Sequence, residues 1–136
     1  MSELARRLID AAQADCASRL AAIEAHAALI EEAETLAATL RSHGIADATA
    51  HGLTCAGFWN RPGRLETWVT VSGCDVLALQ WALRDACLRV VGVRIGDAAG
   101  ELQVDGIDCG LAVPTDVARH FAAILPALMK ENFAHA

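Results

Sequence analysis

Five cysteines and five histidines are the residues of this chain that could hold a metal ion. A structural zinc site usually has pairs of ligands two to four residues apart. The nearest mixed pair here is His51 and Cys55. On an extended strand, two residues four positions apart lie about 13 Å from each other. That separation is too large for one ion, so we expect no metal site, and no motif indicates a cofactor.

Cys74 is the residue that could act as a nucleophile. It follows Ser72-Gly73, where a predicted strand meets the start of a predicted helix. A helix N-terminus favours the thiolate form of a cysteine, whereas the neighbouring Asp75 disfavours it. The sequence ties no histidine to Cys74 as a base, although His51 or His120 could approach it in the fold. A small buried residue at the junction of two elements therefore explains Cys74 better than catalysis does.

A predicted hairpin turn carries two aromatic residues and two arginines, namely Phe58, Trp59, Arg61 and Arg64. Tryptophan and arginine are the residue types that most often anchor protein interfaces. Alternation along a strand lets one of the two aromatic side chains face the core, so the other needs cover elsewhere. We expect this tip to bind another protein. The alternative is that the aromatic residues fold inward and supplement the core, and stacking on RNA is disfavoured by the overall charge.

The formal net charge is −6, and the basic residues are ten arginines and one lysine without a run among them. This balance argues against direct binding to nucleic acid or to an anionic membrane, but it permits binding to a basic protein surface. No apolar run approaches the roughly 18 residues that a membrane span needs. We expect a cytoplasmic protein with reduced thiols, because no secretory signal opens the chain and the number of cysteines is odd.

The elements that position these residues begin with one long helix. Residues 3 to about 42 are predicted to be continuously α-helical, with Ser2 as N-cap and Gly44 at the C-terminal end. A helix of about 40 residues is roughly 60 Å long, which exceeds the width of a small domain. Apolar residues recur along it at heptad spacing, and its seam comprises Ile9, Cys16, Leu20, Ile23, Ile30 and Leu40. We expect two copies to dimerise along this seam; the alternative is that the helix packs on its own domain.

The remainder of the chain is predicted to be a compact domain at 44–136, behind the helical segment 1–43. Strands are expected at 51–59, 65–72, 88–95, 101–104 and 107–113, with helices at 75–87 and from Pro114 onward. Residues 75–87 also show strand-like alternation, but their charged residues recur at helical spacing. Pro126 should kink or split the last helix. The expected fold is α+β, with a small antiparallel sheet and the order α-ββ-α-βββ-α.

The pattern as a whole favours a small acidic protein that regulates by binding and does not catalyse a reaction. We expect it to be a homodimer that binds a protein partner. Its size and charge fit a phage or mobile-element inhibitor of a basic nucleic-acid-binding machine, for example an anti-defence protein. The alternative is a small cytosolic enzyme or ligand-binding domain, with a reactive Cys74 or a site at His51 and Cys55 in a cleft between sheet and helices.

Overall fold

The computed structural model describes residues 2–54, 66–73 and 75–134. Its helices are α1 (Glu3–Ala25), α2 (Ala27–Ser42), α3 (Val76–Asp85) and α4 (Thr115–Ala134), and its strands are β1 (Thr49–Thr54), β2 (Glu66–Thr70), β3 (Val90–Ile95), β4 (Gly100–Val104) and β5 (Gly110–Val113). The predicted α+β class and the order of strands and helices after the N-terminal helical segment are confirmed. The ambiguous stretch at 75–87 is a helix. The predicted turn at 60–63 lies outside the described residues.

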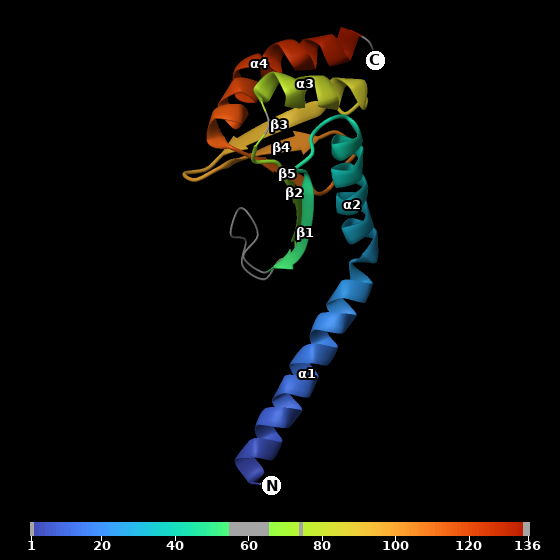
Figure 1. Cartoon of the computed structure of the whole chain (residues 1–136), viewed down its shortest axis with the longest axis vertical. Helices are drawn as coiled ribbons and strands as arrows, with labels where there is room; N and C mark the ends of the chain where they lie inside the picture. Colours follow the sequence, from blue (N-terminus) through green and yellow to red (C-terminus); the bar gives the residue numbers. More distant parts are fainter. Residues whose placement is uncertain (1, 55–65, 74, 135–136) are drawn as a thin grey trace.

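The N-terminal helical segment consists of two helices that meet at His26 (Figure 1). His26 has φ −107° and ψ 18°, outside the α-helical range, and the axis changes direction there. Its ring Nδ1 lies 2.8 Å from the carbonyl oxygen of Ala22, which also accepts the backbone N–H of His26. A side chain that competes for the helical carbonyls is a recognised cause of a kink. The prediction of one uninterrupted helix is therefore wrong at this residue.

Both outer ends of the segment match the sequence signals. The Ser2 hydroxyl oxygen accepts the N–H of Ala5 at 3.1 Å and caps α1. After α2, Gly44 has φ +96°, and the N–H of Ile45 returns to the carbonyl of Leu40 at 3.0 Å. This left-handed glycine followed by a buried apolar residue ends the helix and turns the chain toward β1.

The five strands form one sheet in the order β1-β2-β5-β4-β3. Neighbouring strands are antiparallel except β2 and β5, which run parallel, so the sheet is mixed where the prediction was antiparallel. Strand alternation places Val69, Leu111 and Leu102 side by side on β2, β5 and β4, and all three are buried. This face of the sheet is the one that the helices cover.

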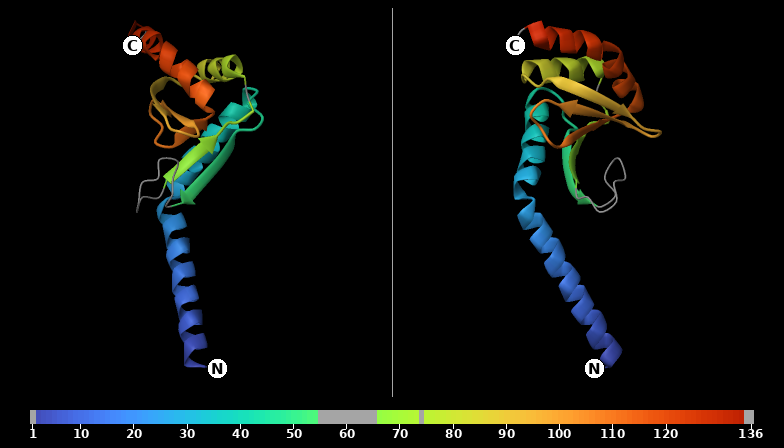
Figure 2. Two further views of the ribbon diagram at one scale, coloured as in Figure 1. Left: turned by 90° about the vertical axis from the view of Figure 1, so that its left-hand side faces the viewer. Right: turned by 180° about the vertical axis from the view of Figure 1, so that it is seen from behind.

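The helices divide the covered face between them (Figures 1 and 2). α2 packs on β1 and β2, and α4 packs on β3 and β4, with α3 beside it. Leu40 of α2, Leu79 of α3 and Phe121 of α4 belong to one continuous core cluster with the strands. Residues 27–42 are therefore part of the same core as the sheet, whereas no residue of α1 is buried.

α4 runs without a break from Thr115 to Ala134, so Pro126 does not split it as the sequence suggested. The helix does bend along its length (Figure 1). Its close approach to β4 depends on Gly100, because a Cβ there would overlap the methyl group of Ala118. Small residues at this contact let helix and strand backbones lie near each other in a core with few aromatic side chains.

Two carboxylates, one on α2 and one in the connection between α2 and β1, bind backbone groups next to strands of the sheet. One Glu32 oxygen accepts the backbone N–H groups of Asp108 and Cys109, at 2.8 and 2.9 Å, just before β5. Asp47 accepts the backbone N–H groups of Ser72 and Gly73, at 2.9 and 2.6 Å, just after β2. The bonds from Gly73 and then from Ser72 lower the pKa of the Asp47 carboxyl below its usual value. Each carboxylate satisfies backbone donors just outside a strand, before β5 for Glu32 and after β2 for Asp47.

Replacing Glu32 with alanine should destabilise the fold. The substitution leaves two backbone N–H groups without their acceptor, which costs about 1–3 kcal/mol of unfolding free energy. Glu34→Ala is the matched control, because Glu34 is an exposed glutamate on the same helix, and it should change the free energy by less than about 0.5 kcal/mol. Urea unfolding followed by circular dichroism at one protein concentration measures both. Equal effects of the two substitutions would show that the Glu32 contact does not stabilise the fold.

Candidate functional site

α1 is the least covered element of the molecule. It leaves the sheet and extends away from it in every view (Figures 1 and 2). None of its 23 residues is buried. Nine large apolar side chains are exposed among the described residues, and five of them lie on α1: Leu4, Leu8, Ile9, Leu20 and Ile23. Each of these five is between 43% and 62% exposed.

These five apolar side chains spread over about 160° of the helix circumference and are called the apolar row below. Such a set is unusual on a surface helix that has only solvent around it. At 1.5 Å per residue, the 23 residues of α1 make a rod of about 35 Å. Isolated helices of this length are marginally stable in water, and most helical stability in proteins comes from packing of an apolar face. The described part of the chain does not cover these apolar side chains of α1.

The structure divides the predicted dimer seam into two parts. Ile9, Cys16, Leu20 and Ile23 lie on α1 and are exposed. Ile30 is half-buried at the start of α2, and Leu40 is fully buried in the core. The alternative that the helix packs on its own domain thus describes α2, and the part of the seam that is open to a partner lies on α1.

The charges of α1 are nearly balanced. It carries three arginines and four acidic residues, so it contributes −1 to a chain total of −6. Arg19 forms an exposed ion pair with Asp15 at 3.3 Å. Arg6 and Glu24 are 18 residues apart, which is five full turns of an α-helix, so they lie on the same side of α1 near its opposite ends. A second helix of the same sequence would meet little electrostatic repulsion.

His51 lies on the face of the sheet opposite to α2. Its ring stacks on Trp68 of β2, with centroids 5.7 Å apart, and its Nε2 lies 2.9 Å from the Thr70 hydroxyl oxygen. Its predicted partner Cys55 lies outside the described residues. Within the part of the chain that the structure describes, no three His, Cys, Asp or Glu side chains lie close enough to hold a metal ion. His51 is thus held by a stacking and hydrogen-bonding contact that alternation along β1 and β2 could have indicated.

The predicted interaction tip and the predicted nucleophile cannot be placed. Phe58, Trp59, Arg61, Arg64 and Cys74 all lie outside the described residues. The structure does show another tryptophan–arginine pair that the sequence reading missed. On α3, the Arg84 guanidinium carbon lies 5.5 Å from the ring centroid of Trp81, and the tryptophan is 58% exposed. Their separation of three residues on a helix was the available signal.

Cys109 is buried beside the Glu32 carboxylate. Burial, followed by the negative charge of Glu32, raises the pKa of the Cys109 thiol to about 12. At neutral pH almost none of it is thiolate, which is the nucleophilic form. Cys109 is therefore a structural residue, in contrast to the exposed Cys16 and Cys87.

Comparisons with protein-family models, with curated proteins and with solved structures give no match. No helix among the described residues is long and apolar enough to cross a membrane. Among the described residues, α1 is the element with the most exposed large apolar side chains.

Alkylation of the folded protein should distinguish Cys87 from Cys109. With iodoacetamide at pH 8, Cys87 should react readily because it is exposed and lies away from α1, whereas Cys109 should react at least about 100-fold more slowly because its thiol is buried and neutral. Peptide mapping by mass spectrometry measures each site, and denaturation in urea should bring Cys109 to the rate of Cys87. A Cys109 rate close to that of Cys87 in the native protein would contradict the buried environment.

Proposed function

We propose that the protein is a non-catalytic binding protein that self-associates through α1 and presents its α+β domain to a protein partner. The observation that carries this proposal is the absence of any buried residue on α1, together with its five exposed leucine and isoleucine side chains. α2 of the same chain packs on β1 and β2. α1 is left with an apolar row and no surface of its own chain to cover it among the described residues.

A second copy of α1 fits this row in size. Two helices would contribute ten large apolar side chains, and half-burial of each is worth about 1 kcal/mol, or about 10 kcal/mol in all. The loss of translational and rotational freedom on association costs about 4–15 kcal/mol. The two amounts are of the same order, so self-association should depend on each of the large side chains.

A second copy also fits in charge, and the charges favour an antiparallel pair. Because Arg6 and Glu24 lie on one side of α1 near opposite ends, an antiparallel partner sets Arg6 of each chain beside Glu24 of the other. A parallel pair places like charges at equal heights. Exposed ion pairs are each worth about 0.2–1 kcal/mol, so two of them direct orientation more than they add affinity.

The identity of the protein partner is a further part of the proposal. The net charge of −6 suits a basic partner surface, as in the hypothesis of a phage or mobile-element inhibitor of a nucleic-acid-binding machine. The net charge is the support for the hypothesis of such an inhibitor. The genes that neighbour this one would test it.

Polar substitutions in the apolar row should weaken self-association. Leu8→Ser combined with Leu20→Ser removes four large side chains from a dimer, and the dissociation constant should rise more than about 100-fold. The matched control, Arg7→Ser with Ala21→Ser, changes positions on the other side of α1 and should shift it less than about threefold. Sedimentation velocity over a concentration series measures each. A monomeric wild-type protein at about 100 µM would overturn the proposal.

Oxidative cross-linking should show the orientation of the pair. The midpoint between Arg6 and Glu24 is residue 15, so Cys16 of each chain lies near the other in either orientation, and the wild type should form a disulfide-linked dimer. An Ala5→Cys, Cys16→Ser variant should not, because antiparallel helices hold the two residues at position 5 about 30 Å apart. Cys16→Ser alone is the control for the remaining cysteines. A strong cross-link at position 5 would establish a parallel pair.

A further inference from the structure

A pocket opens between α3, β3 and α4, at the end of the molecule opposite to α1 (Figure 1). Its volume is about 180 Å³. Five apolar side chains form one part of its lining: Leu83 of α3, Leu88 just before β3, Val90 of β3, and Phe121 and Leu128 of α4. A cavity of about 150 Å³ with such a lining holds a benzene ring, so this pocket has room for a phenylalanine or leucine side chain.

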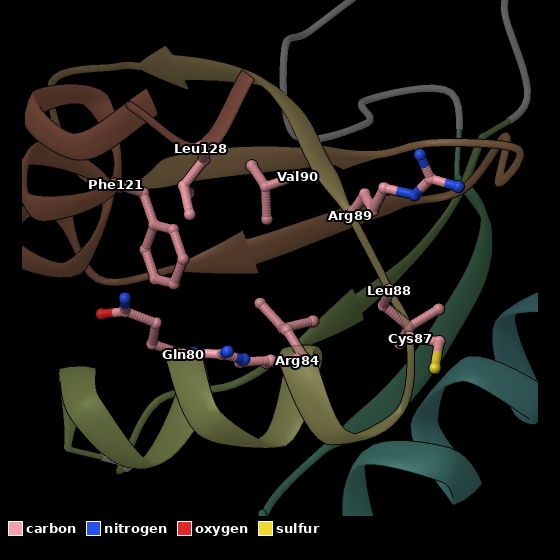
Figure 3. A pocket seen from close by; sticks show the side chains of 9 residues that line it. Gln80, Arg84, Cys87, Leu88, Arg89, Val90, Phe121 and Leu128 are labelled. Carbon is pink, nitrogen blue, oxygen red and sulfur yellow. The ribbon is translucent and has the colours of Figure 1, made fainter. Parts of the chain in front are cut away.

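The other part of the lining is polar and cationic. Arg84 and Gln80 of α3 face Phe121 and Leu128 across the pocket, and the Arg89 guanidinium is directed away from Phe121 (Figure 3). The described lining residues include two arginines and no carboxylate. Within the described part of the chain, neither Arg84 nor Arg89 forms an ion pair. The pocket therefore combines an apolar cavity with unpaired positive charge at its rim.

Gln80 adds a hydrogen-bonding group at the same rim. Its side-chain oxygen lies 3.2 Å from Nε2 of His120, whose ring packs edge-on against Phe121 at 5.8 Å between centroids. With the oxygen engaged by His120, the amide N–H groups of Gln80 are available to an acceptor beside Arg84. An amide and a guanidinium side by side are suited to a carboxylate.

The surface continues from the pocket onto Trp81. The guanidinium of Arg84 stacks on the Trp81 ring, which is more than half exposed, so one arginine links the pocket to a flat aromatic surface. A small carboxylate in the pocket would leave Trp81 uncovered. A peptide that enters the pocket with one side chain can also cover Trp81 with its next residues, and tryptophan and arginine are the residues that most often anchor such contacts.

We propose that this pocket binds an acidic peptide segment of a partner protein, which inserts a phenylalanine- or leucine-sized side chain between α3 and α4 and sets an adjacent carboxylate against Arg84 and Gln80. The inference rests on the proposed function in that it names the chemistry of one segment of the partner. The basic surface that suits the net charge of −6 would be a different part of that partner. The inference does not depend on α1, because the pocket lies at the other end of the molecule. Failure of self-association and failure of peptide binding are therefore separate results.

Fluorescence anisotropy with synthetic peptides tests the proposal on the full chain. The probe is a fluorescein-labelled pentapeptide with phenylalanine between aspartates, and the comparison peptides have alanine at the centre or lysines in place of the aspartates. We expect the phenylalanine–aspartate peptide to bind at least about 10-fold more tightly than either of the others. Its affinity should fall at high salt, because salt screens the attraction between its aspartates and the arginines. Equal binding of the three peptides would overturn the proposal.

Two arginine variants locate the binding site. Arg84→Gln removes the charge of an exposed side chain and leaves it polar. The dissociation constant of the phenylalanine peptide should rise about 10-fold or more. Arg119→Gln changes an exposed arginine of α4 that does not line the pocket, and it should leave binding within about twofold. Unchanged binding by Arg84→Gln would exclude this pocket as the site.

Free 3-phenylpropionate distinguishes a peptide surface from a small-molecule site. It carries the same ring and carboxylate without the neighbouring residues, so it should compete with the peptide at least about 10-fold more weakly than unlabelled peptide does. Competition as strong as that of the unlabelled peptide would show that contacts beyond the pocket add nothing, and the proposed peptide docking would be wrong.

Discussion

The division of the N-terminal helical segment into a packed half and an unpacked half is the constraint on which the rest of the structure depends. The strands β1 and β2 accommodate α2, whose Leu36, Ala37 and Leu40 enter the core. α1 continues past the end of β1, and the kink at His26 directs it away from the sheet (Figure 1). The carboxylate of Glu32 fixes where α2 lies by accepting two N–H groups before β5. α1 therefore contacts only solvent or a partner, as far as the described residues go.

Much of the fold was predictable because the relevant signals are local. Ser2 and Gly44 bound the helical segment by capping chemistry, and alternation in Thr67–Thr70 indicated a half-buried strand. The helix at 76–85 was recoverable from the spacing of its charged residues despite its alternating leucines. The break at His26 was missed because it depends on one ring nitrogen reaching the carbonyl of Ala22, and such competition leaves no mark in the hydrophobic pattern.

The candidate sites were less predictable because they depend on contacts between distant segments. The heptad pattern continues through residue 40, yet the structure buries Leu40 in the core and leaves Leu20 exposed. The heptad spacing alone does not say whether the seam packs on its own domain or on a second chain. The pocket brings together side chains from α3, β3 and α4, and the parallel pairing of β2 with β5 is likewise non-local. Pairings of this kind follow from the sheet order, which the sequence does not contain in any single stretch.

The two proposed binding surfaces differ in chemistry, and pairing through α1 would set the distance between the two pockets of a dimer. The row on α1 is long, apolar and nearly neutral, which suits a second helix, whereas the pocket is small and is lined by two arginines that form no ion pair within the described residues. An antiparallel pair of α1 helices, each about 35 Å long, would hold the two domains at opposite ends of the pair. Each domain would then present its pocket at its far end. Such an assembly would bind two peptide segments at once only if they were widely spaced or lay on separate molecules, because effective concentration falls steeply when a linker cannot span two sites. With both proposals in force, a partner that is extended or repetitive would gain most from the two pockets.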